Sequence, residues 1–407
     1  MKRSFEDARK VILENVSTVG VERVSLLESL GRVVAQDVIA PWEAPRYDNS
    51  AMDGFAVRVA DSAGGQALPI VGYLPAGAAG GQTLEASTAI RIMTGAPVPV
   101  TCDAVLPFED AEEADGKVRA TKPVKSGQHI RRAGEDVKCG DVIAPSGTVV
   151  RPAEISMFAA FNQDAVMVYR KPRVAILSTG DELVEVGQPL APGKIANSNG
   201  AALAAAVLDA GGVPVMLGIA ADTVESHREK LTEGLSADAL ITSAGVSVGD
   251  RDFVRLVLAE LGVESVFAGV DVRPGSPTAF GKKDDKPVFS LPGNPVAALM
   301  MFETFVRPAL LRMSGRERVL KRQLTAVLQE DAHKKPGKTR LLRVRVIADG
   351  GRLVASSAGD QSTGMLNTLT KADGIAVLAS DRDSYKAGDE VDVLPISGTL
   401  DLVEDEG

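Results

Sequence analysis

Residues 173–182 read RVAILSTGDE, an apolar run that ends in two hydroxyls, a glycine and two carboxylates. Arg173–Ser178 has the length and the Val, Ile and Leu content of a buried strand, and Thr179–Glu182 reads as the polar turn that follows it. Strands that are apolar along their whole length are typical of parallel sheets covered on both faces. This stretch therefore predicts an α/β domain with polar side chains at the carboxyl end of a strand.

The same alternation of strand and helix continues on the C-terminal side of this stretch. We expect strands at residues 213–218, 239–242 and 288–291, and helices at residues 199–210, 224–235, 253–261 and 296–313. The loops between them are short, and such repetition predicts a doubly wound, mostly parallel sheet with helices on both faces.

The flanking sequence has a different texture. Residues 39–147 place many Gly and Pro between short β-branched runs, and similar β-rich runs continue after about Lys321. The predicted class is α/β plus β: a doubly wound sheet domain, an inserted β-rich module, a small helical and β linker domain, and a C-terminal all-β domain. The predicted boundaries are 1–38 with 148–170 for the N-terminal helical domain, 39–147 for the inserted module, 171–316 for the α/β domain and 317–407 for the C-terminal β domain.

Composition narrows the possible functions. The 407 residues carry a formal net charge of −9 and are 45% hydrophobic and 4% aromatic. These values exclude a disordered or fibrous chain, and an acidic balance without a basic stripe argues against a nucleic-acid partner. The chain has neither a leader-like N-terminus nor an uncharged apolar run of about 18 residues, so we expect a cytoplasmic protein without a membrane partner.

Residues that commonly bind zinc or transfer protons are scarce. Cys102 and Cys139 have no metal or redox spacing and are expected to be reduced structural thiols, and the three histidines are scattered. A zinc site and histidine-centred acid–base catalysis are therefore disfavoured. The chemistry should depend on carboxylates, hydroxyls, backbone amides, and Arg or Lys.

Three strand-to-helix loops of the α/β region have the chemistry of a ligand site. They are residues 178–182, residues 242–252 and residues 291–295, and they combine glycines, hydroxyls, carboxylates and free backbone amides. Any one of them is more often an ordinary connection, but three in one domain favour a phosphate-bearing small molecule with a divalent cation held by carboxylates. The phosphate-loop and dinucleotide-binding glycine motifs are absent, which argues against an ATPase or a dinucleotide enzyme.

Three polar stretches outside this region have two interpretations. Residues 47–57, 91–99 and 131–137 are rich in Asp, Asn, Ser, Thr, Arg and Gly. They form either well-capped turns or part of a site shared across a domain or subunit junction.

Six motifs together identify a family. They are DNSAMDGFAV from Asp48, RIMTGAPVP from Arg91, GEDV from Gly134, STGDEL from Ser178, SAGVSVGDRDF from Ser243 and LPGNPV from Leu291. Over nearly its full length the chain resembles the molybdopterin molybdenumtransferases and is similar to the C-terminal domain of gephyrin. The resemblance implies an elongated homodimer of four-domain subunits, with residues 1–38 and 148–170 as the dimerisation domain and 171–316 as the molybdopterin-binding domain.

The resemblance also implies the reaction and its residues. Adenylyl-molybdopterin and molybdate would give molybdenum cofactor and AMP with the help of Mg²⁺, in a site between the α/β domain of one subunit and the β module of the other. Residues matching family positions needed for activity are Asp53, Thr94, Asp136, Glu182, Asp222 and Asp252. We expect Asp53, Glu182 and Asp252 to hold the metal–phosphate unit, because hard carboxylates suit Mg²⁺. Substrate contacts are expected from Thr179, Gly180, Asp181, Gly245, Ser247, Pro292, Gly293 and Asn294.

The expected molybdate pocket departs from the family pattern. Many relatives carry Lys-Pro-Gly-Lys-Pro where this chain has Arg273-Pro274-Gly275-Ser276-Pro277. Arg273 keeps a positive charge, whereas Ser276 offers only a hydrogen bond, so another base should compensate. The expected sources are Arg340, Arg343 or Arg345, with Ser362 and Thr363; the alternative for each arginine is a solvated strand face. The departure affects molybdate affinity and the choice between molybdate and tungstate.

Two other functions remain open from the sequence. The preceding adenylyltransferase shares the loop chemistry of residues 242–252, but the β module and the C-terminal β domain argue against it. A non-catalytic scaffold of the gephyrin kind is disfavoured because Asp53, Glu182 and Asp252 are retained.

Overall fold

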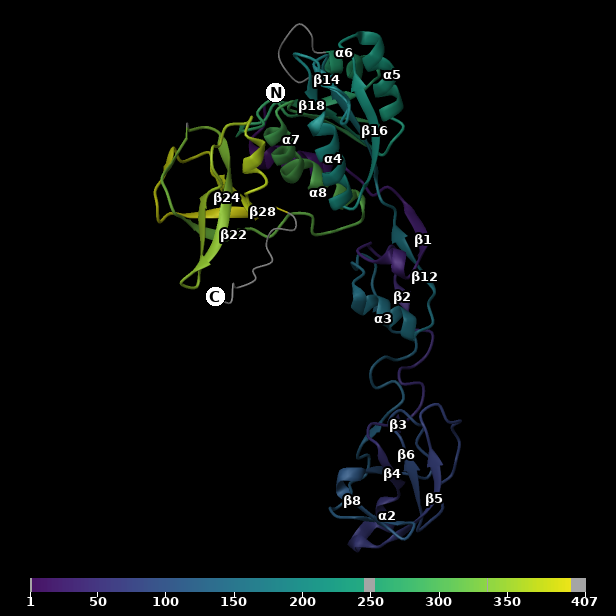
Figure 1. Cartoon of the computed structure of the whole chain (residues 1–407). Coiled ribbons are helices and arrows are strands. Elements are labelled where there is room, and N and C mark those ends of the chain that lie inside the picture. Colours follow the sequence, from purple (N-terminus) through teal and green to yellow (C-terminus); the bar gives the residue numbers. More distant parts are fainter. Residues whose placement is uncertain (1, 245–252, 335, 397–407) are drawn as a thin grey trace. The chain divides into compact units, whose positions relative to one another are not determined.

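The computed structural model describes residues 2–244, 253–334 and 336–396. The chain forms two compact units (Figure 1). The first unit contains residues 1–24, 29–35 and 167–407, and the second contains residues 25–28 and 36–166. Gly245, Ser247 and Asp252, expected in the ligand site, lie outside the described residues. The four-domain division stays a prediction.

A six-stranded sheet forms the centre of the first unit, in the order β16-β13-β17-β21-β20-β18. Its first four strands are parallel, β20 runs antiparallel to β21, and β18 runs antiparallel to β20 and so in the direction of the first four. The bounds are β16 Val213–Ala220, β13 Arg173–Thr179, β17 Ala239–Ser243, β21 Lys286–Leu291, β20 Ala279–Lys283 and β18 Glu264–Ala268. Neighbouring parallel strands have buried residues on both faces, which confirms the predicted doubly wound sheet.

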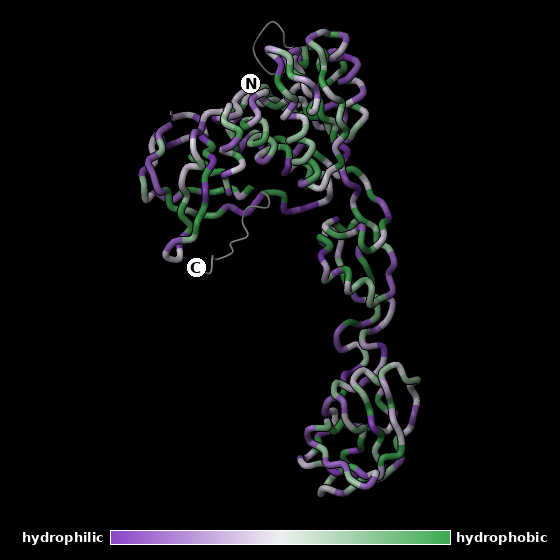
Figure 2. Tube along the Cα trace, in the orientation of Figure 1, coloured by the Kyte–Doolittle hydropathy of each residue, from purple (hydrophilic) through white to green (hydrophobic). Residues whose placement is uncertain are grey.

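Helices cover both faces of this sheet, and alternate residues of β13 show how the two cores divide. Val174 and Ile176 belong to one apolar core, whereas Ala175 and Leu177 belong to the other. The helices of the first core are α1 (Phe5–Glu14), α4 (Ser198–Asp209), α7 (Pro295–Met301) and α8 (Arg307–Met313), and those of the second are α5 (Val224–Gly234) and α6 (Phe253–Glu260). Figure 2 shows the apolar residues concentrated in these internal segments.

The helix expected over residues 296–313 contains a wider turn. Between α7 and α8, residues Phe302–Val306 form a π-helical segment, η4, and the Arg307 N–H donates to the Phe302 carbonyl. Pro308 follows directly; it has no N–H, and its ring would clash with the Thr304 carbonyl in a regular α-helix. The π turn accommodates this proline without ending the helix.

The C-terminal strands close into a small barrel. Strand β24 (Thr339–Asp349) pairs with β25 (Arg352–Ser357) along its second half and with β26 (Gly374–Leu378) along its first. Strands β22 (Leu324–Leu328) and β28 (Glu390–Pro395) complete the ring. A short strand of the α/β region, β19 (Val272–Arg273), adds to β24 in parallel and places Arg273 opposite Arg340.

The second unit contains a curled six-stranded sheet in the order β7-β4-β6-β5-β9-β8. The bounds are β7 Ala104–Pro107, β4 Gly54–Val57, β6 Ala89–Ile92, β5 Leu68–Leu74, β9 Lys117–Ala120 and β8 Ala111–Ala114. The short strands β2 (Val38–Ile39) and β11 (Val142–Ala144) pair outside this sheet, and α3 (Pro152–Ala160) follows them. The β-rich character predicted for residues 39–147 is present.

None of the described helices combines the length and the apolar character needed to cross a bilayer.

Candidate functional site

Two of the three predicted loops meet at the carboxyl end of the sheet. Asn199, in the first turn of α4, donates from Nδ2 to the Ser243 hydroxyl at 2.7 Å and to the Gly293 carbonyl at 2.8 Å. One amide therefore joins the loops that follow β17 and β21. Asn199 was not predicted as a site residue; the only sequence signal was the Asn-Ser-Asn-Gly run, which reads as a helix cap.

The turn after β13 brings predicted acids together. The Asp181 carboxylate accepts a hydrogen bond from the Asp222 N–H at 3.1 Å, so the loops after the neighbouring strands β13 and β16 are joined. Glu182 is exposed, and its carboxylate lies over Gly180. A Cβ on Gly180 would lie 2.5 Å from Glu182 Oε2, and φ at this residue is +140°, so only glycine fits.

Thr179 has a supporting position below this turn. Its hydroxyl is buried and lies 2.8 Å from His227 Nε2, while His227 Nδ1 lies 2.8 Å from the Thr223 carbonyl. A carbonyl only accepts, so Nδ1 carries the ring proton and the Thr179 hydroxyl donates to Nε2. The hydroxyl hydrogen of Thr179 is therefore donated within the protein and is not available to a ligand. His227, which sequence reasoning set aside, positions the loop rather than binding a metal.

The third predicted loop leads into α7. Pro292 is buried, whereas Gly293 and Asn294 are exposed. Asn294 is the N-cap residue of α7, and its carbonyl accepts the Ala298 N–H. Exposed backbone at the start of a helix suits an anionic group.

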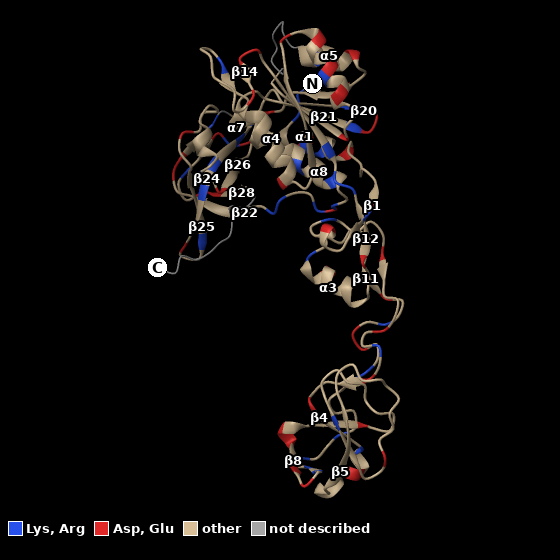
Figure 3. Cartoon of the chain, turned by 45° about the vertical axis from the view of Figure 1, so that its right-hand side comes forward, with Lys and Arg blue, Asp and Glu red and all other residues tan. Residues whose placement is uncertain are grey.

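The predicted oxyanion residues meet where β19 joins β24. Arg273 and Arg340 are register partners, and burial together with the Arg273 charge lowers the pKa of Arg340. A cavity of about 220 Å³ lies beside Arg340 and is lined also by Glu330, Asp331, His333 and Gln361. Figure 3 shows basic residues on β24. Thr363, half-buried, lies in the turn that follows Gln361.

The other expected compensating arginines have different surroundings. Arg343 is fully buried and donates to the Asp360 and Ser362 carbonyls and to the Thr368 hydroxyl, so it holds the 360–363 turn. Arg345 is exposed on β24. The Ser276 hydroxyl donates to the Val270 carbonyl at 3.0 Å and accepts from Lys338 Nζ at 3.5 Å. Sequence reasoning did not single out Lys338.

The second unit holds the predicted Asp53–Thr94 pair. The Asp53 Oδ1 accepts from the Thr94 N–H at 2.7 Å and from its hydroxyl at 2.8 Å. These hydrogen bonds, the backbone one first, lower the pKa of Asp53, which is exposed and therefore ionised at neutral pH. Asp136 is also exposed, and its N–H donates to the Ala44 carbonyl at 3.1 Å.

Within the described ranges, no cluster of three or more His, Cys, Asp or Glu side chains is arranged to hold a metal ion. Hard oxygen donors are nevertheless present at the sheet end, in Asp181, Glu182 and Asp222. Mg²⁺ typically uses one or two carboxylates together with substrate phosphates, so this donor set fits Mg²⁺ better than a softer metal.

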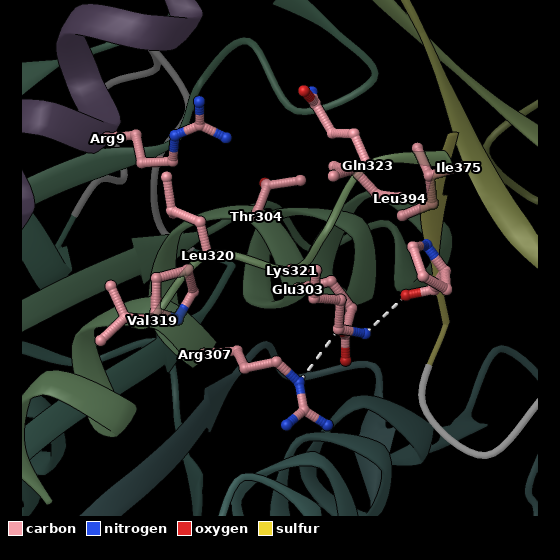
Figure 4. A pocket seen from close by; sticks show the side chains of 12 residues that line it. Arg9, Glu303, Thr304, Arg307, Val319, Leu320, Lys321, Gln323, Ile375 and Leu394 are labelled. Carbon is pink, nitrogen blue, oxygen red and sulfur yellow. Dashed lines mark hydrogen bonds and ion pairs between the residues drawn. The ribbon is translucent and has the colours of Figure 1, made fainter. Parts of the chain in front are cut away.

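A second cavity, of about 90 Å³, lies between α1, η4, α8 and the barrel (Figure 4). Glu303 accepts from Arg307 Nε at 3.1 Å and lies 2.8 Å from Lys321 Nζ. Arg9 also lines this cavity and stacks over the Phe5 ring. Since one carboxylate holds cations from the helix and from the barrel side, we interpret this cluster as a structural junction.

Comparisons with known proteins cover almost the whole chain. Residues 3–162 match the MoeA N-terminal region (domain I and II), residues 175–312 match a probable molybdopterin binding domain, and residues 325–396 match the MoeA C-terminal region (domain IV).

Individual relatives agree with these matches. The molybdopterin molybdenumtransferase of Staphylococcus epidermidis is 34% identical over 397 residues, which cover 96% of this chain and 95% of the relative. Molybdopterin molybdenumtransferase 2 of Mycobacterium tuberculosis is 36% identical over 404 residues, covering 96% and 99%. A solved molybdopterin biosynthesis MoeA protein from Pyrococcus horikoshii has a TM-score of 0.85 at 31% identity, covering 97% of this chain and 99% of that structure. The chain belongs to the molybdopterin molybdenumtransferase family.

Proposed function

We propose that this protein is the transferase that converts adenylyl-molybdopterin and molybdate into molybdenum cofactor and AMP. Membership of the family supports the reaction class. The observation that carries the proposal within this chain is the convergence of the polar loops after β13, β16, β17 and β21 through Asn199 and Asp181. Loops at the carboxyl ends of parallel strands are where open α/β sheets bind ligands.

Different residues of the site would contact the substrate or support the residues that do. Gly293 and Asn294 would contact a phosphate group through exposed backbone at the start of α7. Gly180 lets the Glu182 carboxylate lie directly over the turn, because it carries no side chain. Asp181 orients the Asp222 loop through its hydrogen bond, and Thr179 supports the turn from inside through His227.

Mg²⁺ would be held by Glu182 and Asp53. When bound, the ion would neutralise phosphate charge and so reduce the repulsion between the adenylate and the molybdate dianion. The Thr94 hydrogen bonds keep the Asp53 carboxylate ionised, as a magnesium ligand must be. Asp252 completes this proposed set from outside the described residues.

Molybdate would bind between Arg273 and Arg340, beside Thr363. The two arginines are register partners on β19 and β24, and guanidinium groups suit a tetrahedral dianion; one terminal nitrogen of Arg340 also donates to the His333 carbonyl.

We further propose a homodimer, active in the cytoplasm, in which the Asp53–Thr94 turn of one subunit completes the α/β site of the other. The motifs carrying Asp53 and Glu182 belong to different compact units of the chain, which is compatible with such sharing.

AMP release tests the proposed reaction. Purified protein is given adenylyl-molybdopterin and Mg²⁺, with and without molybdate, and AMP and product are quantified by chromatography. The proposal expects AMP release that requires molybdate and falls when Mg²⁺ is chelated. A parallel sample with molybdopterin and Mg-ATP should form no adenylate. Adenylate formation there would identify an adenylyltransferase, and inactivity in both samples would favour a scaffold.

A further inference from the structure

Lys338 lies beside the position where this chain carries serine in place of a family lysine. Its Nζ donates to the Ser276 hydroxyl at 3.5 Å across 62 residues of sequence. Ser276 in turn donates its only hydroxyl hydrogen to the Val270 carbonyl at 3.0 Å. The serine is therefore occupied as a donor, and the ammonium group of Lys338 is the polar group next to it with hydrogens to spare.

Two cations lie where β19 pairs with β24. Arg273 and Arg340 face each other in the β19–β24 register, and the Arg273 charge contributes to the lowered pKa of Arg340. In the described part of the chain, no carboxylate lies within ion-pair distance of Lys338 or Arg273. Like charges placed together without a carboxylate repel each other, and an anion bound between them would relieve that repulsion.

The alternation of side chains along β24 separates Arg340 from the other candidate bases of that strand. Arg340 lines the barrel cavity together with Leu342 and Val344, whereas Arg343 and Arg345 point to the opposite face of the strand. Arg343 is also fully buried, and its Nε and one terminal nitrogen donate to Thr368 and to the 360–363 turn, whereas its other terminal nitrogen, Nη1, is buried without a partner among the described residues. Lys338 precedes β24 by one residue and reaches back to the β19 loop.

We propose that Lys338 is the specificity-determining residue that supplies the positive charge absent at residue 276, and that it binds a tetrahedral dianion together with Arg273 and Arg340. This inference rests on the proposed function, since it names the anion of that reaction. The positive charge would thus come from the segment before β24 instead of from the loop after β19.

The test measures binding of molybdate itself to the full-length protein by isothermal titration calorimetry, together with the KM for molybdate and kcat in AMP release. Lys338→Met keeps the length of the side chain without its charge. We expect it to weaken molybdate binding and raise the KM about tenfold or more, the effect of one charge-assisted hydrogen bond, with kcat and adenylyl-molybdopterin affinity much less affected. Lys338→Arg should retain binding within about threefold, because the charge is kept.

A double variant that moves the positive charge back to residue 276 gives the more discriminating comparison. Adding Ser276→Lys to Lys338→Met should restore molybdate affinity, because the cation returns to the position that it has in relatives. A matched control is Lys371→Ala, an exposed lysine of the same barrel region, which should leave every parameter unchanged. Circular dichroism and thermal unfolding of each variant verify folding.

The outcomes separate the two proposals. Unchanged molybdate affinity in Lys338→Met, alongside a loss in Arg273→Ala, would overturn the role of Lys338 and leave the oxyanion site in place. Unchanged affinity in Lys338→Met, Arg273→Ala and Arg340→Ala together would overturn the location of the oxyanion site. Weakened binding in Lys338→Met that Ser276→Lys rescues supports the inference.

Discussion

At the scale of single residues, the Asp53–Thr94 pair shows how residues from two separate motifs come into direct contact. Both hydrogen bonds to Asp53 Oδ1 come from one residue, Thr94, and each stabilises the charged carboxylate. The two residues are 41 positions apart, and the family resemblance predicted each of them as a site residue. Their direct contact could not be predicted, because it depends on the pairing of β4 with β6.

We predict that Thr94→Ala raises the pKa of Asp53 part of the way toward its ordinary value, because the hydroxyl bond is lost and the larger backbone N–H bond remains; Thr94→Ser, which keeps the hydroxyl, should not raise it. A carboxylate with a lowered pKa keeps its charge to lower pH. Its charge, and any activity that depends on it, is lost only as the pH falls through that pKa. Raising the pKa therefore moves the acidic limb of the AMP-release profile to higher pH. Side-chain carboxyl NMR titration measures the pKa directly, and equal values in the two variants would contradict the assignment.

The predicted oxyanion residues, which lie where β19 pairs with β24, mark the limit of sequence-based prediction at this scale. Arg273 and Arg340 were expected to act together, and the structure places them in register. Arg343 was an equally plausible base in the sequence, but burial commits it to the 360–363 turn. Lys338 was missed because its contact with Ser276 exists only after β19 has paired with β24.

At the scale of elements, the close approach of β4 to β7 fixes the turn that carries Asp53. A Cβ on Gly54 would lie 2.0 Å from the Leu106 carbonyl oxygen, inside van der Waals contact. This glycine therefore serves strand packing directly next to a site residue.

We predict that Gly54→Ala destabilises the protein by about 1–3 kcal/mol, the usual range for a side chain forced into a packed interior. Gly72→Ala is the matched control in the same sheet, since its Cβ would lie 3.8 Å from Ile90 in ordinary contact. Urea unfolding followed by circular dichroism compares the two. Equal stability of both variants would contradict the close approach of these strands.

The π-helical segment η4 places Glu303 between two cations. The side chains of Arg307, Glu303 and Lys321 are 8%, 15% and 22% exposed, and burial lowers the pKa of both Arg307 and Lys321. Hydrophobic periodicity predicted a helix through residue 313 but not this π turn, which follows from the backbone chemistry of Pro308.

We predict that Glu303→Gln costs about 1–3 kcal/mol of folding stability, because Arg307 and Lys321 lose their shared carboxylate while Arg307 keeps its ion pair with Asp209. Glu260→Gln is the control: its pair with Arg228 is 45–47% exposed and should contribute about 0.5 kcal/mol or less. Thermal and urea unfolding measure both. A stability loss no larger than that of the control would show that the junction does not depend on this charge.

At the scale of the whole molecule, the class of fold was predictable because strand–helix alternation and glycine-rich β runs are local signals. The doubly wound sheet and the C-terminal β region appear where those signals predicted them. Closure of the barrel through β24 and β26, and the antiparallel pair β20–β18, depend on long-range pairing that periodicity does not encode.

In the proposed function, acids from the two compact units, Asp53 and Glu182, would act on one substrate in a site shared between two subunits. Asp53→Asn and Glu182→Gln should each abolish AMP release, since each removes a carboxylate from the proposed metal–phosphate unit. The most direct measurement is AMP release after the two inactive variants are mixed, unfolded together and refolded. Random pairing gives mixed dimers with one intact site, so we predict recovery of about a quarter of wild-type activity. Equal amounts of either variant alone should stay inactive, and a mixture that stays as inactive as its components while wild-type protein refolds to full activity would contradict the account.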